Sequence, residues 1–270
     1  MDVTGKKLSE IIRSSKKLLN NFLDHLSIRD FFLKFYYQYR NFAPSKLKDT
    51  LRSIRFHSNF IRKGDLCFDI GANIGDYTLI YLILGARVVC IEPEKENLRK
   101  LIIRYQKKKN VSIVPKALAD FEGFSELFTC KNLTTISTIS KKWKSNGRFS
   151  DKYKNYIVQK VPTTTLDMLI KQYGLPKFCK IDVEGSEYKV LKGLTKKIQY
   201  ISFEITKEFI GDAINCVDYL INLGNVRFNF FHPKIKDFYY PRWVKKDKLF
   251  EGLNKFNDEL FWGDIYAKFL

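Results

Sequence analysis

The sequence lacks the features that mark membrane-spanning, zinc-binding, disulfide-rich and secreted proteins. No uninterrupted apolar stretch reaches the roughly 20 residues that a membrane-spanning helix needs. The 5 cysteines are scattered and form no CxxC pair, so the sequence indicates neither a zinc site nor a disulfide framework. The stretch from Met1 to Lys17 is polar and basic, unlike a secretory signal peptide. The expected location is therefore the reducing cytoplasm.

Acidic residues are outnumbered by basic ones. The chain has 29 Asp and Glu against 48 Lys and Arg, which gives a formal net charge of +19. This charge is spread along the whole chain, which is typical of a solvated, lysine-rich surface. It would also favour nucleic acid, an anionic lipid surface or an acidic substrate, so it leaves the class of partner open.

The 270 residues are enough for one domain with an extension, and a hydrophobic share of 45% allows a packed core. Residues 1–55 contain apolar residues at helical spacing with lysines between them, and then a basic, aromatic stretch. They predict an N-terminal extension of amphipathic helices, followed by one domain over residues 56–270. The extension would cover the sheet or the active site, lie on the inner face of a membrane, or form a dimer surface.

One stretch organises the rest of the chain, and it runs from Leu66 to Pro93. Short apolar runs at 66–70 and 87–91 flank a glycine-rich turn and an apolar segment of helical length. Apolar runs this short, separated by glycine, are typical of buried parallel strands. The stretch therefore predicts a strand–turn–helix–strand unit, with Glu92 at the end of the second strand.

The turn of this unit predicts a ligand. Glycines at Gly71 and Gly75 let the backbone approach a bound molecule, and the following helix directs free N–H groups toward it. Glu92 falls 21 residues after Gly71, close to the ~20 expected of an acid that binds ribose hydroxyls. Asn73 stands where a dinucleotide site would have glycine. Asp69 disfavours a phosphate and suits an ammonium group, so an adenosine-type ligand is favoured over a pyrophosphate.

Four motifs together resemble one family. They are DIGANIGDYT, CIEPEKENLRKL, VPKALAD and KIDVEGSEYKVLKGL, and the likeness runs from about Phe56 to the C-terminus. The sequence resembles the FkbM-type methyltransferases, which use S-adenosylmethionine. The resemblance implies a class I methyltransferase fold: a Rossmann-like α/β, doubly wound, mostly parallel seven-stranded sheet with an antiparallel C-terminal hairpin. It also implies methyl transfer to oxygen, as in most relatives.

The motifs give candidate residues for binding S-adenosylmethionine. Glu92 would bind the ribose hydroxyls and Asp69 the methionine ammonium, while the resemblance places Ala117 and Leu118 against the adenine. The complete set of predicted cofactor-binding residues is Asp69, Gly71, Ala72, Asn73, Gly75, Thr78, Glu92, Ala117 and Leu118.

Carboxylates are the candidates for the catalytic base. A hydroxyl must lose its proton as it attacks, and none of the 3 histidines (His25, His57 and His232) follows a predicted strand near the motifs. The catalytic residues are therefore predicted to be Asp182, Glu184 and Glu204, which follow predicted strands. A structural role for Glu184 and Glu187 at a helix start is the alternative. The same three residues offer oxygen ligands for magnesium, but their spacing demands no metal, and none is predicted.

Residues 132–156 are rich in Ser, Thr and Lys, and they predict a mobile loop near the acceptor site. The predicted function is methyl transfer from S-adenosylmethionine to a hydroxyl of a small molecule or glycan. An RNA methyltransferase is the first alternative, motivated by the charge, although no [ND]PP[YF] tetrapeptide occurs. A non-catalytic module that binds the cofactor is the second.

Overall fold

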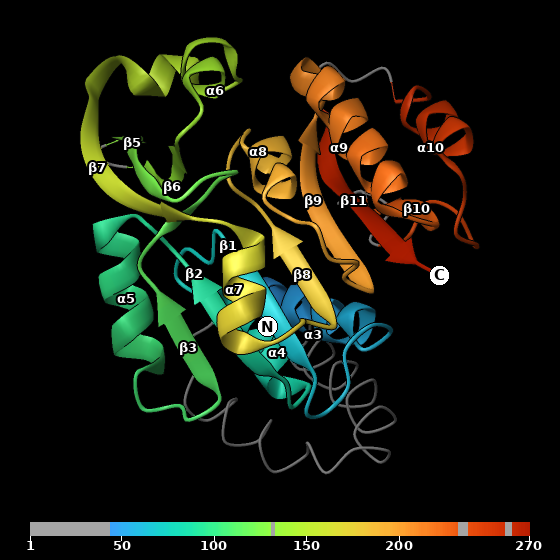
Figure 1. Ribbon diagram of the computed structural model, residues 1–270, viewed down its shortest axis with the longest axis horizontal. Helices are drawn as coiled ribbons and strands as arrows, with labels where there is room; N and C mark the ends of the chain where they lie inside the picture. Colours follow the sequence, from blue (N-terminus) through green and yellow to red (C-terminus); the bar gives the residue numbers. More distant parts are fainter. Residues whose placement is uncertain (1–43, 131–132, 232–236, 257–260) are drawn as a thin grey trace, which may run out of the picture. The chain divides into compact units, whose positions relative to one another are not determined.

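The computed structural model describes residues 44–130, 133–231, 237–256 and 261–270 (Figure 1). The chain divides into two units, Met1–Asn59 and Phe60–Leu270, and each is described by itself. The described part of the first unit contains helix α3, Pro44–His57. The helices predicted within residues 1–43 lie outside the described residues, as do His25 and His232.

A seven-stranded sheet forms the centre of the second unit (Figure 1). In spatial order its strands are β10 (Val226–Phe231), β11 (Trp262–Phe269), β9 (Tyr200–Thr206), β8 (Phe178–Ile181), β1 (Leu66–Ile70), β2 (Arg87–Ile91) and β3 (Val111–Val114). All neighbours are parallel except β10–β11 and β11–β9, which are antiparallel. The predicted seven-stranded, mostly parallel sheet with antiparallel C-terminal strands is confirmed.

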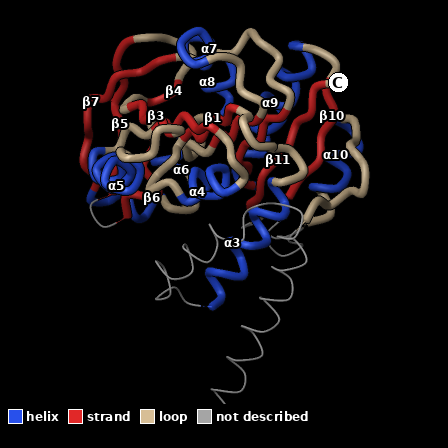
Figure 2. The backbone as a smooth tube through the Cα atoms, turned by 90° about the horizontal axis from the view of Figure 1, so that it is seen from below, coloured by secondary structure: helices blue, strands red, loops and turns tan. Residues whose placement is uncertain are grey.

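Helices cover both faces of this sheet. Figure 2 shows α7 (Leu166–Tyr173), α8 (Glu187–Lys192) and α9 (Ile210–Leu223) on one side, and α4 (Asp76–Ile83) and α5 (Lys95–Tyr105) on the other. Side chains fix where helices begin: Glu94 accepts the N–H of Asn97 at 2.8 Å at the start of α5, and Thr165 accepts that of Met168 at the start of α7. A further helix, α10, spans Lys246–Leu253.

A second, four-stranded sheet lies within residues 117–164. Its spatial order is β4 (Ala117–Leu118), β7 (Tyr156–Thr164), β5 (Gly123–Cys130) and β6 (Leu133–Thr138). Helix α6 (Lys141–Asn146) and the 3-10 helix η1 (Ser150–Asn155) connect β6 to β7. A small apolar cluster that includes Phe128, Ile136, Trp143 and Tyr153 packs these elements together.

The prediction of a mobile loop over residues 132–156 was wrong for its described part, because β6, α6 and η1 occupy most of it. Strand β6 is rich in β-branched residues, which favour strands, and it pairs with β5. Ser140 accepts the N–H of Trp143 at 3.1 Å and so caps α6. Most of the Ser and Thr residues that indicated a loop belong instead to β6 and to the cap of α6, and the Lys residues belong to α6 and η1.

The core of the main sheet is apolar and reduced. Strands β1, β2 and β8 are buried almost along their whole length, as expected of parallel strands covered on both faces. All 5 cysteines are buried and free. Among the described helices, none is long and apolar enough to cross a membrane.

The strand that carries Glu204 continues further than predicted. Glu204 was expected at the exit of its strand, but β9 runs on to Thr206, and Glu204 lies inside it. There it faces Asp264 across the antiparallel pair of β9 and β11. Residues directly opposite in such a pair share one face of the sheet, so Asp264 and Glu204 lie side by side.

The close approach of two chain segments at Gly71 gives a test of the fold. A Cβ at Gly71 would lie 1.7 Å from the carbonyl oxygen of Asp182, and φ is +74°. We expect Gly71→Ala to destabilise the protein by roughly 3 kcal/mol or more, because backbone strain and overpacking add. Urea denaturation measures this loss.

Gly64→Ala is the matched control for Gly71→Ala. Gly64 has a φ of +88°, but a Cβ there would meet no atom within 4 Å. It should therefore cost only the backbone strain, about 1–2 kcal/mol. Equal losses in the two variants would show that Gly71 and Asp182 are not in close contact.

Candidate active site

A cavity of about 510 Å³ opens at the carboxyl ends of β1, β2 and β8. Ligands bind at this edge in open α/β sheets, where the direction of winding reverses. The predicted residues that line the cavity are Asp69, Gly71, Ala72, Asn73, Glu92, Ala117, Leu118, Asp182 and Glu184. Gly75, Thr78 and Glu204 are not among the lining residues. Strand β6 contributes Thr134, Thr135, Ser137 and Thr138, so both sheets form the cavity wall.

The glycine-rich turn after β1 shapes one end of the cavity. The carbonyl of Ile91 accepts the N–H groups of Gly71 and Ala72 at 3.0 Å each, which ties the turn to β2. Asn73 has a left-handed backbone with a φ of 50°, and its buried Oδ1 has no hydrogen-bond partner among the described residues. A buried acceptor without a partner is costly, so this atom marks a place where a ligand donor would fit.

Gly75 has a different role from the one predicted. It precedes α4 with a φ of 81°, and a Cβ there would lie 2.4 Å from the ring of Tyr105 on α5. The hydroxyl of Tyr105 donates to the carbonyl of Gly75 at 2.6 Å. Gly75 therefore permits close packing of the turn on α5, and it lies behind the cavity wall.

Thr78 also lies outside the cavity lining and contacts a residue that belongs to it. Its hydroxyl donates to the carboxylate of Asp69 at 2.6 Å, and both residues are buried. Burial raises the pKa of Asp69, while Lys180 and the hydrogen bond from Thr78 act against this rise. Thr78 thus orients a carboxylate that itself reaches the cavity.

Glu92 is held by the backbone on both of its oxygens. Oε2 accepts the N–H of Asn73 at 2.7 Å, and Oε1 accepts that of Glu94 at 2.9 Å. Burial raises the pKa of Glu92 to about 7, although these hydrogen bonds lower it. Each carboxylate oxygen can accept a second hydrogen bond. The carboxylate is therefore fixed in place with acceptor capacity left for a pair of hydroxyls.

The part of the cavity that lies beside β4 is apolar. Ala117 and Leu118 of β4 are buried, and Ile91 and Leu127 join them in the lining. An apolar lining near the fixed carboxylate of Glu92 and the unpartnered Oδ1 of Asn73 suits an adenosine. The residues present therefore fit S-adenosylmethionine.

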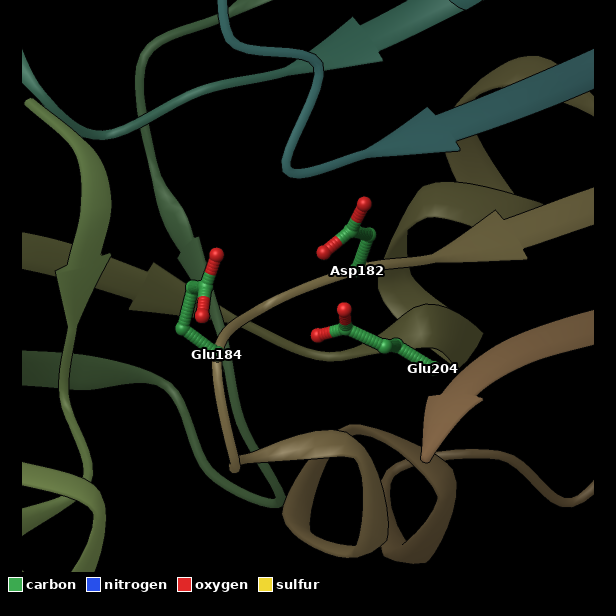
Figure 3. A group of neighbouring side chains, drawn as sticks. All are labelled: Asp182, Glu184 and Glu204. Carbon is green, nitrogen blue, oxygen red and sulfur yellow. The ribbon is translucent and has the colours of Figure 1, made fainter. Parts of the chain in front are cut away.

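Three carboxylates meet at the other side of the cavity, beyond the end of β8. Figure 3 shows Asp182, Glu184 and Glu204 pointing toward one another from the β8–α8 loop and from β9. One ligand oxygen of each lies within 4.8 Å of the others, so the sequence prediction of three neighbouring acids fits the geometry. Such a group suits proton transfer, and oxygen ligands at this spacing could also hold a divalent cation.

The protonation of this carboxylate group is shifted. Burial raises the pKa of Glu184 and of Glu204 well above the usual value, and the neighbouring charge of Asp182 raises both further. Asp182 itself pairs with Lys180, whose Nζ lies 2.6 Å from Oδ2. Glu184 and Glu204 are therefore the members of the group in which burial and neighbouring charge favour the protonated form.

Glu187 is structural, which agrees with the alternative interpretation of that residue. Its Oε1 accepts the N–H of Val183 at 3.0 Å and that of Gly185 at 3.3 Å. These bonds close the loop between β8 and α8. Burial raises the pKa of Glu187 to about 7.

Lys180 and Asp264 belong to this region but are not among the predicted site residues. Lys180 lines the cavity, and its Nζ lies 4.4 Å from the centre of the Tyr77 ring. Burial lowers the pKa of Lys180, but Asp182, Tyr77 and Asp264 outweigh it and raise the pKa overall. Lys180 lies two residues before Asp182, and this spacing could have revealed it. Nothing in the sequence gives the register that brings in Asp264.

The burial of Glu187 gives a prediction about stability and pH. Its pKa is higher in the folded protein than in the unfolded chain, so its contribution is fully present below pH 4.5 and is lost as pH rises through about 7. A shift of this size corresponds to roughly 3 kcal/mol at most. We expect Glu187→Gln to lose less stability than the wild type between pH 5 and pH 8, as measured by urea denaturation. The exposed Glu96→Gln is the control and should follow the wild type.

Three solved structures of other proteins are similar to this chain at low identity. Precorrin-6y C5,15-methyltransferase from Geobacter metallireducens is 12% identical over 82% of this chain and 84% of that one, with a TM-score of 0.42. Fibrillarin from Aeropyrum pernix, with natively bound S-adenosyl-L-methionine, is 12% identical over 77% and 68%, with a TM-score of 0.41. An rRNA methylase from Streptococcus thermophilus is 12% identical over 81% and 94%, also at 0.41.

A match in sequence, and not these structural similarities, shows which family the chain belongs to. No curated protein matches the chain significantly. Residues 69–236, well over half of the 270, match the family described as the methyltransferase FkbM domain. This stretch contains the glycine-rich turn, Glu92 and the three clustered carboxylates. The resemblance is thereby confirmed, together with S-adenosylmethionine as the cofactor of the family. This chain belongs to the FkbM methyltransferase domain family.

Proposed function

We propose that this protein binds S-adenosylmethionine in the cavity and moves its methyl group to a hydroxyl of a small molecule or glycan. Glu92 accepts the ribose hydroxyls, Asp69 faces the methionine ammonium, and Ala117 and Leu118 contact the adenine. The fixed carboxylate of Glu92, with acceptor capacity to spare, supports this orientation. The remaining predicted residues, Gly71, Ala72 and Asn73, form the wall between the two ends.

The bound cofactor supplies a methyl group activated by a positive sulfur. The protein must hold the acceptor oxygen about 3 Å from that methyl carbon and take up the proton that the hydroxyl loses. Glu184 or Glu204 accepts this proton, because burial raises the pKa of both carboxyls and so favours their protonated form. Asp182 holds the acceptor hydroxyl or the base in line and pairs with Lys180. The meeting of these three carboxylates beside the cavity is the observation that carries the proposal.

The charge of the site favours an uncharged acceptor. Although the chain has a net charge of +19, the acceptor side of the cavity contains Asp182, Glu184 and Glu204, with Asp264 beside them. An anionic phosphate or carboxylate would be repelled there. A polyol offers hydroxyl donors to these carboxylates.

Labelled transfer tests this function directly. The protein is incubated with cofactor carrying a labelled methyl group and with cell extract, and glycan, lipid and RNA fractions are then separated. We expect label in the glycan or small-molecule fraction. Label in RNA alone, with binding that falls steeply as salt rises, would favour the RNA alternative. Cofactor binding without any transfer would leave a non-catalytic module. Fractionation of the producing cells would test the expected cytoplasmic location and any peripheral contact with the membrane.

Replacing Glu92 should weaken cofactor binding. We expect Glu92→Gln to cost roughly 1–3 kcal/mol of binding free energy, because a hydrogen bond to a charged group is lost. Since the pKa of Glu92 is about 7, the wild type should bind about tenfold more weakly at pH 6 than at pH 8. The variant should lose this dependence on pH. Calorimetry with S-adenosylhomocysteine measures both effects, and unchanged affinity in folded Glu92→Gln would reject the ribose assignment.

Replacing the clustered carboxylates should reduce turnover and spare cofactor binding. We expect Glu184→Gln and Glu204→Gln to lower methyl transfer by about 10²–10⁴-fold, the range for loss of a general base, and Asp182→Asn to lower it as well. Calorimetry should show near wild-type affinity for S-adenosylhomocysteine. The exposed Glu122→Gln is the control. Full activity in all three site variants would dismiss this choice of catalytic residues.

Chelation separates proton transfer from metal assistance. If the carboxylates act as base and orienting groups alone, transfer measured after dialysis against EDTA should match that of untreated protein. A loss that added magnesium restores would show that the three carboxylates hold a cation instead.

A further inference from the structure

Strand β6 of the second sheet contacts the loop between β8 and α8 through Thr138. The hydroxyl of Thr138 donates to the backbone carbonyl of Glu184 at 2.7 Å and accepts the N–H of Ser140 at 2.9 Å. Thr138 is 1% exposed, so its hydroxyl is shielded from water. A side chain that is 46 positions away in sequence therefore holds the backbone of Glu184.

The backbone at Glu184 needs such support. Glu184 has a φ of 54°, a left-handed conformation that is uncommon for a residue other than glycine, asparagine or aspartate. Gly185 follows with a φ of 85°, and a Cβ there would lie 2.9 Å from the ring of Trp143 on α6. Strained backbone persists only where the surroundings determine it, and here both contacts come from the second sheet and its helix.

The conformation of this loop decides where the carboxylate of Glu184 points. A rotation of the 184–185 backbone would swing the side chain away from Asp182 and Glu204, which it faces in Figure 3. The side chain of Glu187 accepts the N–H of Gly185, which belongs to the same planar peptide group as the carbonyl of Glu184, but this bond is long at 3.3 Å. The bond from Thr138 to the carbonyl is shorter, at 2.7 Å, and holds the other side of that peptide group. Thr138 supplies the donor that fixes this carbonyl.

We infer that Thr138 is a positioning residue for the catalytic carboxylate Glu184. This inference rests on the proposed function, in which Glu184 serves in proton transfer. In this inference Thr138 acts through the carbonyl of Glu184 and not as the base. The other end of β6 is anchored as well, because Thr134 and Asn97 exchange hydrogen bonds of 2.8 and 3.2 Å. The strand that closes the cavity thus also sets the geometry of the base.

The test compares two replacements of Thr138. Thr138→Val keeps the shape and removes the hydroxyl, whereas Thr138→Ser keeps the hydroxyl. We expect Thr138→Val to lower labelled methyl transfer to the acceptor fraction by about 10- to 100-fold, since small displacements of a catalytic group have effects of this size. Thr138→Ser should restore most of the activity. Both should bind S-adenosylhomocysteine within about twofold of the wild type, because Glu92 and Asp69 are untouched.

A double variant distinguishes positioning from general destabilisation. If Thr138 acts through Glu184, the variant with both Thr138→Val and Glu184→Gln should be no slower than Glu184→Gln alone. Amide hydrogen exchange should be faster at Val183 and Gly185 in Thr138→Val and normal in Thr138→Ser. Thr129→Val is the matched control, because Thr129 is buried on β5 and its hydroxyl has no partner among the described residues. It should be as active as the wild type.

Three results would overturn the inference. They are full activity in Thr138→Val, losses that multiply in the double variant, or a fall in cofactor affinity that matches the fall in transfer. If Glu184→Gln alone is fully active, the proposed role of Glu184 fails first, and that outcome is visible without any Thr138 variant. Where circular dichroism shows that valine is not accommodated, Thr138→Ala is compared with Thr138→Ser in its place.

Discussion

The ion pair between Lys180 and Asp182 is the interaction on which the site depends. Removing several carboxylates from water is expensive unless a positive charge lies among them. The Nζ of Lys180 lies 2.6 Å from Asp182 and over the ring of Tyr77, on a strand between those that carry Asp69 and Glu204. This one buried ammonium lets acids gather at the carboxyl ends of neighbouring strands, and it leaves the others with raised pKa values.

The second sheet completes the wall of the cavity that the main sheet forms in part. Parallel strands bring Asp69, Glu92 and Asp182 to one edge, but they leave the cavity open above. Strand β6 adds a wall of hydroxyl groups, and Thr138 and Trp143 hold the strained turn at Glu184. The cavity and the three clustered carboxylates are therefore connected by hydrogen bonds, and the segment that was predicted to be a loop supplies these bonds.

Much of the fold followed from local pattern. Short apolar runs and punctuating glycines indicated β1 and β2 at their observed bounds, and the caps at Glu94 and Thr165 lie where helices α5 and α7 begin. The acids predicted near strand ends do meet, because parallel strands deliver their exits to one edge. Sequence alone placed Gly75 and Thr78 in the cofactor site, whereas the structure puts them behind the cavity wall, since proximity in sequence to a turn does not fix which way a side chain faces.

By itself, the sequence determined the order of strands and helices, the glycine turn and the set of carboxylates that could serve, because these depend on residues close together in the chain. Only the tertiary structure decided that Lys180 neutralises Asp182, that Asp264 stands opposite Glu204, and that Thr138 supports Glu184. Those relations depend on strand register and on packing between two sheets. A shift of one residue would turn each side chain to the other face, and no local pattern records that choice.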